Sequence, residues 1–280
     1  MCGMDAFQEE IREEMDTLYY IINNRLDITE FPKATGELRK YQLADAELLR
    51  LFHEACQKHN LIYWLDWGTL LGAIRHNGFI PWDDDLDVCM PRDDYNKAKT
   101  VLTEEFEQLG FSTLVRNGMF IWDEITGVSL DVFAVDSTKY DKNETTLEIK
   151  AREFLKAFRR MPEPYDDRTV RSFDELRAKT MDEEKGTLIY YSALESTSRL
   201  CTYTPDVIFP LCKHVFEQYE FMVPHNSNEY LKTQFHDYMS YPHSGVLHHV
   251  KRGVPTYLRA SHNNENLDDV IEKLSRISLL

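Results

Sequence analysis

The sequence predicts an α/β protein: a mixed β-sheet core flanked by helices, followed by a largely helical C-terminal half. Short strand-like segments alternate with helix-like segments between residues 60 and 135. After Asp136 the sequence becomes charged and helix-prone. Hydrophobic residues make up 42% of the 280 residues and aromatic residues 12%, which is ample for a buried core and argues against global disorder. We therefore expect N-terminal helices in residues 1–60, the sheet core in residues 61–136 and a mostly helical part in residues 137–280.

The first elements follow from local patterns. Apolar residues recur every four positions along Ala6–Asn23, which predicts a helix with one apolar face. A second helix is expected over Gly36–His59, again with an apolar stripe. Leu61–Asp66 is short and rich in Ile, Tyr and Trp, so it predicts a buried strand. Gly68-Thr69 then predicts a turn, with Thr69 capping a short helix that ends near Arg75.

The later elements are predicted in the same way. Trp82–Met90 follows the Asn77-Gly78 turn and is expected to be a strand. Asp93–Leu109 is expected to be a helix that Gly110 ends, and Ser227 is expected to cap a helix near the C-terminus. The other expected strands are Phe111–Val115, Met119–Trp122, Val128–Val135, Val207–Phe209 and Val215–Phe221, and the other expected helices lie in Lys139–Arg160, Phe173–Arg199, Glu229–Met239 and Asn266–Ile277.

Charge and cysteine content limit the kinds of partner and the cellular compartment that we expect. Lys and Arg number 32 against 48 Asp and Glu, so the formal net charge is −16. A protein that grips nucleic-acid backbone needs clustered basic residues, so no nucleic-acid partner is expected. The most apolar stretch, Leu61–Ile74, is shorter than the roughly 20 residues of a membrane span. With no basic, apolar leader and five cysteines without CxxC spacing, the chain reads as cytoplasmic, either free or peripherally attached to the inner face of a membrane.

The most informative stretch is an acidic cluster, Asp83-Asp84-Asp85-Leu86-Asp87, set in strongly apolar sequence. If it is a strand, Asp83, Asp85 and Asp87 share one face at a spacing of roughly 6–7 Å. Such carboxylates suit one or two hard cations, and without a cation they would raise one another's pKa. Asp131 lies alone in an apolar strand, where an unpaired charge is costly. It is either a satisfied core carboxylate or, beside the cluster, a metal ligand or base.

A candidate phosphate site precedes the cluster. Gly68-Thr69 joins a strand to a helix start, where backbone N–H groups bind anions well. The alternative is a plain turn. Arg75 suits a bidentate contact with either a phosphate or an acid of the cluster, and the sequence favours neither role.

The runs Trp67-Gly68-Thr69-Leu70-Leu71-Gly72-Ala73-Ile74-Arg75 and Ile80-Pro81-Trp82-Asp83-Asp84-Asp85-Leu86-Asp87-Val88 resemble the signature of the LicD family. The resemblance implies a nucleotidyltransferase-like fold, with residues 61–136 as its catalytic core. It also implies transfer of a phospho-alcohol from a CDP-activated donor to a hydroxyl of a cell-surface glycan, such as lipopolysaccharide or teichoic acid. Phosphocholine from CDP-choline is favoured, because the field of an acidic protein attracts the cationic choline head group. A nucleotidyltransferase acting on a small molecule or protein, and an inactive glycan- or nucleotide-binding module, are the alternatives.

Roles for single residues follow from the resemblance. Asp85 and Asp87 would ligate Mg²⁺, or Mn²⁺ in its place, and Asp131 would complete this site or act as the base. Gly68, Thr69, Arg75 and Asp83 would bind substrate. A second family-like block begins at Phe209 and includes Phe216-Glu217. This chain departs from the family's usual pattern at Phe235-His236-Asp237 and Pro242-His243, so its acceptor is not inferred from any one relative.

Overall fold

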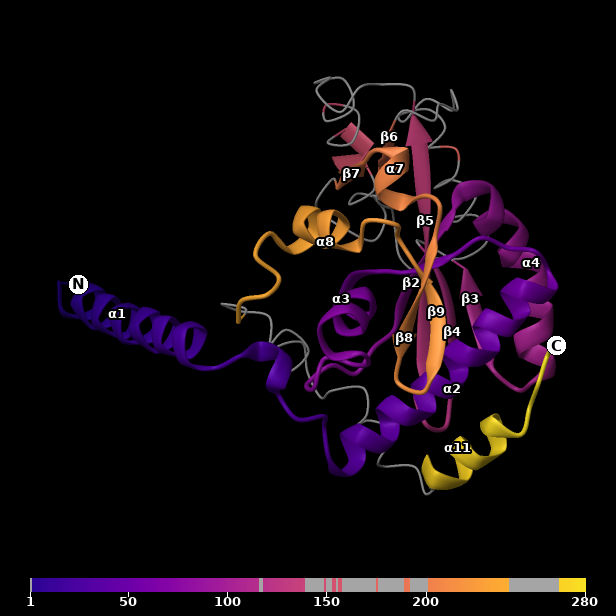
Figure 1. Ribbon diagram of the computed structural model, residues 1–280, viewed down its shortest axis with the longest axis horizontal. Helices are drawn as coiled ribbons and strands as arrows, with labels where there is room; N and C mark the ends of the chain where they lie inside the picture. Colours follow the sequence, from indigo (N-terminus) through magenta and orange to yellow (C-terminus); the bar gives the residue numbers. More distant parts are fainter. Residues whose placement is uncertain are drawn as a thin grey trace.

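The computed structural model describes residues 2–115, 118–138, 201–241 and 267–280, together with residues 149, 153–154, 156–157, 175 and 189–191 (Figure 1). It is a mixed α/β fold, which confirms the predicted class. The predicted helices Lys139–Arg160 and Phe173–Arg199 lie almost wholly outside these residues. One described piece, the strand β6 (Ile189–Tyr191), is not helical as expected. Among the described residues, no helix combines the length and the apolar character needed to cross a membrane.

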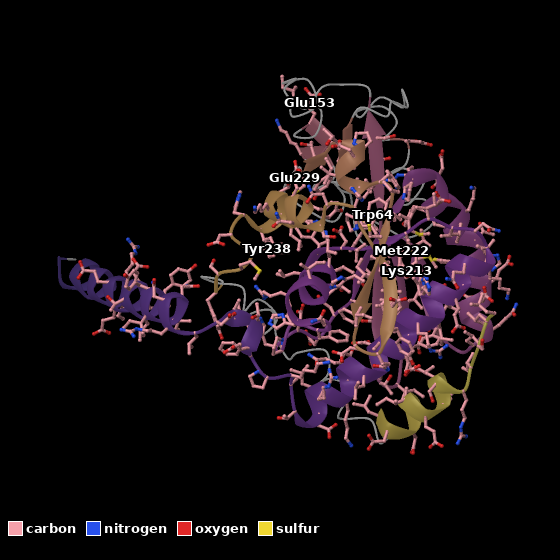
Figure 2. All side chains as sticks on the ribbon, viewed as in Figure 1. Trp64, Glu153, Lys213, Met222, Glu229 and Tyr238 are labelled. Carbon is pink, nitrogen blue, oxygen red and sulfur yellow. The ribbon has the colours of Figure 1, made fainter. Side chains whose placement is uncertain are left out.

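The N-terminal helices occupy different environments. α1 (Cys2–Arg25) projects away from the rest of the described chain, and its side chains from Ile11 to Arg25 are mostly exposed (Figures 1 and 2). A short 3-10 helix, η1 (Ile28–Glu30), leads to α2 (Gly36–Lys58). α2 lies across the sheet, where it contacts β5 and the C-terminal helix α11 (Leu267–Ser275). Its apolar stripe, which includes Leu48, Leu49 and Phe52, is fully buried.

The central sheet is built around two parallel strands. β2 (Asp87–Pro91) pairs in parallel with β5 (Ser129–Thr138), and all other pairs in this sheet are antiparallel. The strand order is β1-β2-β5-β4-β3, and β6 and β7 extend the far end of β5. The remaining strands are β1 (Trp64–Leu65), β3 (Ser112–Val115), β4 (Met119–Trp122) and β7 (Thr202–Tyr203).

Helices and a hairpin cover this sheet. α3 (Trp67–His76) contacts β2 and α8 (Ser227–Phe235), and α4 (Arg92–Gln108) contacts β2, β3 and β5. The hairpin β8 (Cys212–Phe216) and β9 (Tyr219–Val223) packs on β1 and α3. Apolar residues of the sheet, the hairpin and α2 form one buried core, with Trp64 at its centre (Figure 2).

Several predicted elements are wrong in detail. The strand Trp82–Met90 begins only at Asp87, because residues 81–82 form a turn closed by the Asp83 N–H on the Ile80 carbonyl (3.0 Å). Trp82, in this turn, is half-buried: it packs at the edge of the core and against the rings of Phe31 and Tyr241. Gly68-Thr69 is not a turn: α3 already begins at Trp67, with Asp66 as its N-cap.

The C-terminal part differs from the prediction in three places. The predicted strand Val207–Phe209 is not formed: Val207 and Ile208 lie in a short helix, α7 (Pro205–Ile208), which Pro205 starts because its fixed φ suits the first helical turn. Val215–Phe221 is the hairpin β8–β9, bent at Glu217, which has φ of 56°. The helix predicted over Glu229–Met239 is α8, which begins at Ser227 and ends at Phe235, and Asn226 caps it rather than Ser227.

Candidate active site

The acidic cluster lies where the loop after α3 enters β2. Asp83 and Asp84 are buried in this loop, whereas Asp85 and Asp87 are half-buried. The predicted alternation therefore holds only from Asp85 onward, where Leu86 and Val88 face the core. Asp85 and Asp87 are the members that remain open to a ligand.

Asp131 lies beside Asp87. The two residues are register partners on the parallel strands β2 and β5, so their side chains leave the same face of the sheet. The Asp131 N–H donates to the Leu86 carbonyl at 2.8 Å, which fixes this register. The structure thus brings together two carboxylates that are 44 residues apart in the sequence.

These carboxylates act on one another electrostatically. Desolvation, followed by the charges of Asp85 and Asp131, raises the pKa of Asp87 well above its usual value. Burial and the charges of Asp85 and Asp84 likewise raise the pKa of Asp83. Like charges held this close in a folded protein are unfavourable at neutral pH, and a bound cation would relieve them.

The chemistry of this set suits magnesium. Carboxylate oxygens are the ligands that Mg²⁺ prefers, and Mg²⁺ is usually held by one or two carboxylates together with substrate phosphates. Within the described part of the chain, no three His, Cys, Asp or Glu side chains are already grouped as ligands of a common ion. The structure pairs Asp87 with Asp131, and a magnesium site made by these residues with Asp85 stays a prediction.

Gly68 and Thr69 support the aspartates. The Thr69 hydroxyl accepts a hydrogen bond from the Asp87 N–H at 2.8 Å. A Cβ at Gly68 would lie 2.7 Å from Oδ2 of Asp83, so only glycine leaves room for this carboxylate over the first turn of α3. An anion is stabilised at a helix N-terminus. The start of α3 at Gly68-Thr69, where the sequence predicts a phosphate, therefore lies next to the Asp83 carboxylate.

Arg75 is buried and is tied to the chain that follows α8. Its Nη1 donates to the carbonyl of Tyr238 at 2.6 Å; Tyr238 is labelled in Figure 2. Burial lowers the pKa of Arg75 to about 10, and the charge of Asp83 opposes that shift. The guanidinium therefore joins the region of Asp83 to the segment after α8.

Two buried carboxylates near the site were not among the predicted residues. Asp66, the N-cap of α3, accepts from Sγ of Cys89 (2.6 Å) and from Nε2 of Gln234 (2.7 Å). Asp45 of α2 accepts from the Ser129 N–H at 3.0 Å, and burial raises its pKa, with further increases from the charges of Asp84, Asp85 and Asp131. The sequence does contain a signal for Asp45, because this acidic residue lies within the apolar stripe of the helix Gly36–His59.

Comparison with known proteins places this site in a family. The family model described as "LicD/FKTN/FKRP, nucleotidyltransferase domain" matches residues 60–226, more than half of the chain, and this range includes all seven predicted site residues. The chain belongs to the LicD family.

Individual relatives match over shorter ranges. The LicD lipopolysaccharide cholinephosphotransferase of Haemophilus influenzae is 50% identical over 68 residues, which is 24% of this chain and 26% of the relative. The mouse ribitol 5-phosphate transferase FKRP is 33% identical over 81 residues, 29% of this chain and 14% of the relative. The chain thus spans about a quarter or less of these LicD relatives. Among solved structures, the antibiotic-resistance factor ANT(2″)-Ia aligns with 48% of this chain and 85% of its own at 16% identity and a TM-score of 0.25.

Proposed function

We propose that this protein transfers a phospho-alcohol, specifically phosphocholine, from a CDP-activated donor to a hydroxyl of a glycan. The observation that carries the proposal is the pairing of Asp87 with Asp131 across β2 and β5, with Asp85 two residues upstream, inside a LicD-family domain. Transfer of a substituted phosphate requires positioning and charge neutralisation more than covalent help from the protein.

The predicted site residues divide into those that would hold the metal and those that support or adjoin them. Asp85 and Asp87 would hold Mg²⁺, and Asp131 would complete this site or accept the proton of the acceptor hydroxyl. The metal, when bound, would neutralise the donor's diphosphate and stabilise the leaving CMP. Thr69 holds the backbone of Asp87, and Gly68 leaves space for Asp83. Arg75, which the Tyr238 carbonyl holds in place, would bind the donor phosphate or brace the aspartates.

Choline is favoured over ribitol as the alcohol. The choline-specific relative is 50% identical over its matched range, against 33% for the ribitol-specific one. A net charge of −16 also favours a donor with a cationic head group. The acceptor would be a cell-surface glycan or its precursor, by analogy with the lipopolysaccharide named for the bacterial relative.

The test is a donor competition. CMP release is measured from CDP-choline, CDP-ethanolamine and CDP-ribitol with one glycan acceptor, with Mg²⁺ and with a chelator. We expect Mg²⁺-dependent release and the highest kcat/KM for CDP-choline. A preference for CDP-ribitol would overturn the donor, and strict dependence on a nucleoside triphosphate would overturn the reaction and favour nucleotidyl transfer.

A further inference from the structure

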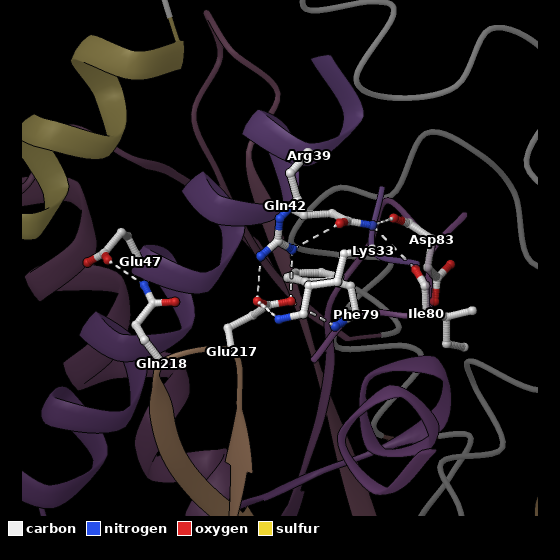
Figure 3. A network of polar contacts seen from close by, with 9 residues as sticks. All are labelled: Lys33, Arg39, Gln42, Glu47, Phe79, Ile80, Asp83, Glu217 and Gln218. Carbon is white, nitrogen blue, oxygen red and sulfur yellow. Dashed lines mark hydrogen bonds and ion pairs between the residues drawn. The ribbon is translucent and has the colours of Figure 1, made fainter. Parts of the chain in front are cut away.

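A buried polar cluster joins three segments that are far apart in the sequence (Figure 3). Its centre is Glu217, in the turn of the β8–β9 hairpin, with a side chain only 2% exposed. The Glu217 carboxylate accepts two hydrogen bonds from Arg39 of α2, at 2.9 and 2.6 Å, and one from Lys33 at 2.7 Å. It also accepts the backbone N–H of Phe79 at 3.2 Å. The hairpin, α2 and the loop after α3 therefore meet at one carboxylate.

The far end of the same loop is held by Gln42 of α2, which is fully buried. Its Nε2 donates to the carbonyl of Asp83 at 2.9 Å and to that of Ile80 at 3.3 Å. Arg39 links the two ends, because its Nη1 also donates to Oε1 of Gln42 at 3.3 Å (Figure 3). The loop from Asn77 to Asp83, which delivers the acidic cluster, is thus fixed at both ends from α2 and the hairpin.

The start of this loop, Asn77-Gly78, is closely packed against its neighbours. The Glu217 N–H donates to the Asn77 carbonyl at 2.9 Å. A Cβ at Gly78 would lie 2.3 Å from Oε1 of Glu217, and a Cβ at Gly72 would lie 2.4 Å from the Gly78 carbonyl. The turn is therefore wedged between α3 and the hairpin.

We propose that Glu217, Arg39 and Gln42 are positioning residues, which set the loop so that Asp85 and Asp87 meet Asp131 in the geometry that transfer requires. The inference rests on the proposed function. These three side chains act through the backbone of residues 77–83. Rigid support of this kind matters because a displacement of about 1 Å at a reacting group can cost roughly 100-fold in rate.

The chain offers a matched control in Glu47. This residue lies on the same helix, is also buried, and accepts from the same hairpin, through the Tyr219 hydroxyl (2.5 Å) and Nε2 of Gln218 (3.2 Å). Its other contact is Arg50 at 2.9 Å, so it joins α2 to the hairpin without any of these bonds reaching the 77–83 loop (Figure 3).

The experiment compares Glu217→Gln, Gln42→Met and Glu47→Gln in the full chain. Hydrogen exchange of peptides covering residues 78–88 is measured together with kcat and KM for transfer and the thermal midpoint. We expect faster exchange and at least a tenfold lower kcat in Glu217→Gln and Gln42→Met. In Glu47→Gln we expect exchange in this segment and kcat within about twofold of wild type, even where the midpoint falls. Gln42→Met keeps the test decisive if Glu217→Gln does not fold.

Two outcomes would overturn the positioning role. One is unchanged exchange over residues 78–88 in both variants. The other is a loss of kcat in Glu47→Gln as large as that in Glu217→Gln at the same loss of thermal midpoint, because the cluster would then only stabilise the fold. A wild-type chain that transfers from no CDP-alcohol would overturn the proposed function instead. The hydrogen-exchange comparison over residues 78–88 would still test whether these side chains position the loop.

Discussion

At the scale of single residues, Asp87 carries a conflict between folding and function. Its pKa is raised because its carboxylate is desolvated beside Asp85 and Asp131. The ionised form is therefore unfavourable for the folded chain, yet a metal ligand must be ionised. A carboxylate whose pKa is shifted by desolvation and by like charges in this way is typical of a functional site.

Asp87→Asn should separate these two effects. Without metal, removing one of three like charges should leave the thermal midpoint unchanged or higher. Transfer should fall by about 100-fold or more, which is roughly 2.7 kcal/mol of transition-state stabilisation. The measurements are a thermal melt in chelator and kcat/KM with Mg²⁺, with the exposed Asp269→Asn as control. Wild-type turnover in Asp87→Asn would remove this residue from the site.

The pKa of Glu217 is shifted in the opposite direction to that of Asp87. Burial raises its pKa, but the hydrogen bonds and charges of Arg39 and Lys33 outweigh burial, so the pKa is lowered from 4.5. A lowered carboxylate pKa gives stability that is present above the unfolded-state value and is lost as pH falls through the folded one.

Glu217→Gln should therefore be most costly at neutral pH. We expect a loss of about 3 kcal/mol in the free energy of unfolding at pH 7, since a partly buried ion pair is broken. The difference from wild type should shrink toward pH 3. Urea unfolding at both pH values checks this, and an equal loss at the two would show that the charge of Glu217 is not what stabilises the fold.

At the scale of elements, α3 and the turn after it are packed without spare volume. Gly72 faces the carbonyl of Gly78 and the N–H of Ile80, both of which are backbone groups that do not rotate away. By contrast, Gly36 has a positive φ of 64° with nothing within 4 Å of an added Cβ.

Gly72→Ala should cost more than Gly36→Ala. We expect about 3 kcal/mol for Gly72→Ala from overpacking against backbone, and about 1 kcal/mol for Gly36→Ala from its left-handed conformation alone. Gly72→Ala should also lower transfer, because the displaced turn carries the acidic loop. Urea midpoints and kcat of both variants give the comparison; equal costs would mean that α3 shifts easily.

The elements that sequence patterns predicted well are those with a regular period. The helix Gly36–His59 and the strand Met119–Trp122 were predicted within a residue of their observed bounds, because their apolar patterns are fixed by burial on one or two faces. The end of the loop before β2 was predicted as strand, because apolar and acidic residues alternate along Trp82–Met90. In the structure, residues 81–82 form a turn and the strand begins only at Asp87. The role of Glu217 depends on contacts with distant segments, which no local pattern contains.

At the scale of the whole molecule, several buried acids reduce the stability of the metal-free chain. The pKa values of Asp45, Asp83 and Asp87 are all raised from 3.8, so above that pH the folded chain binds more protons than the unfolded chain. Its stability should then fall as pH rises through the raised pKa values.

Magnesium should reverse this trend. At about 100 times its Kd, a ligand of the folded state alone adds roughly 2.7 kcal/mol. We expect Mg²⁺ to raise the thermal midpoint more at pH 7 than at pH 5, where protons compete for the carboxylates. Asp85→Asn should lose most of this increase. A midpoint that Mg²⁺ shifts equally in wild type and Asp85→Asn would place the ion elsewhere.

The register of β2 against β5 also bears on how such proteins could diversify. Neighbouring strands lie about 4.8 Å apart whatever loops they carry, so the backbone spacing of Asp87 and Asp131 is set by the pairing of β2 with β5. The chain after β9 could be exchanged between relatives while this pairing is kept, whereas the loop before β2 must also keep its contacts with Glu217 and Gln42. A one-residue insertion inside either strand, in contrast, would turn one carboxylate to the opposite face. The phase of these two strands is therefore what this architecture cannot vary.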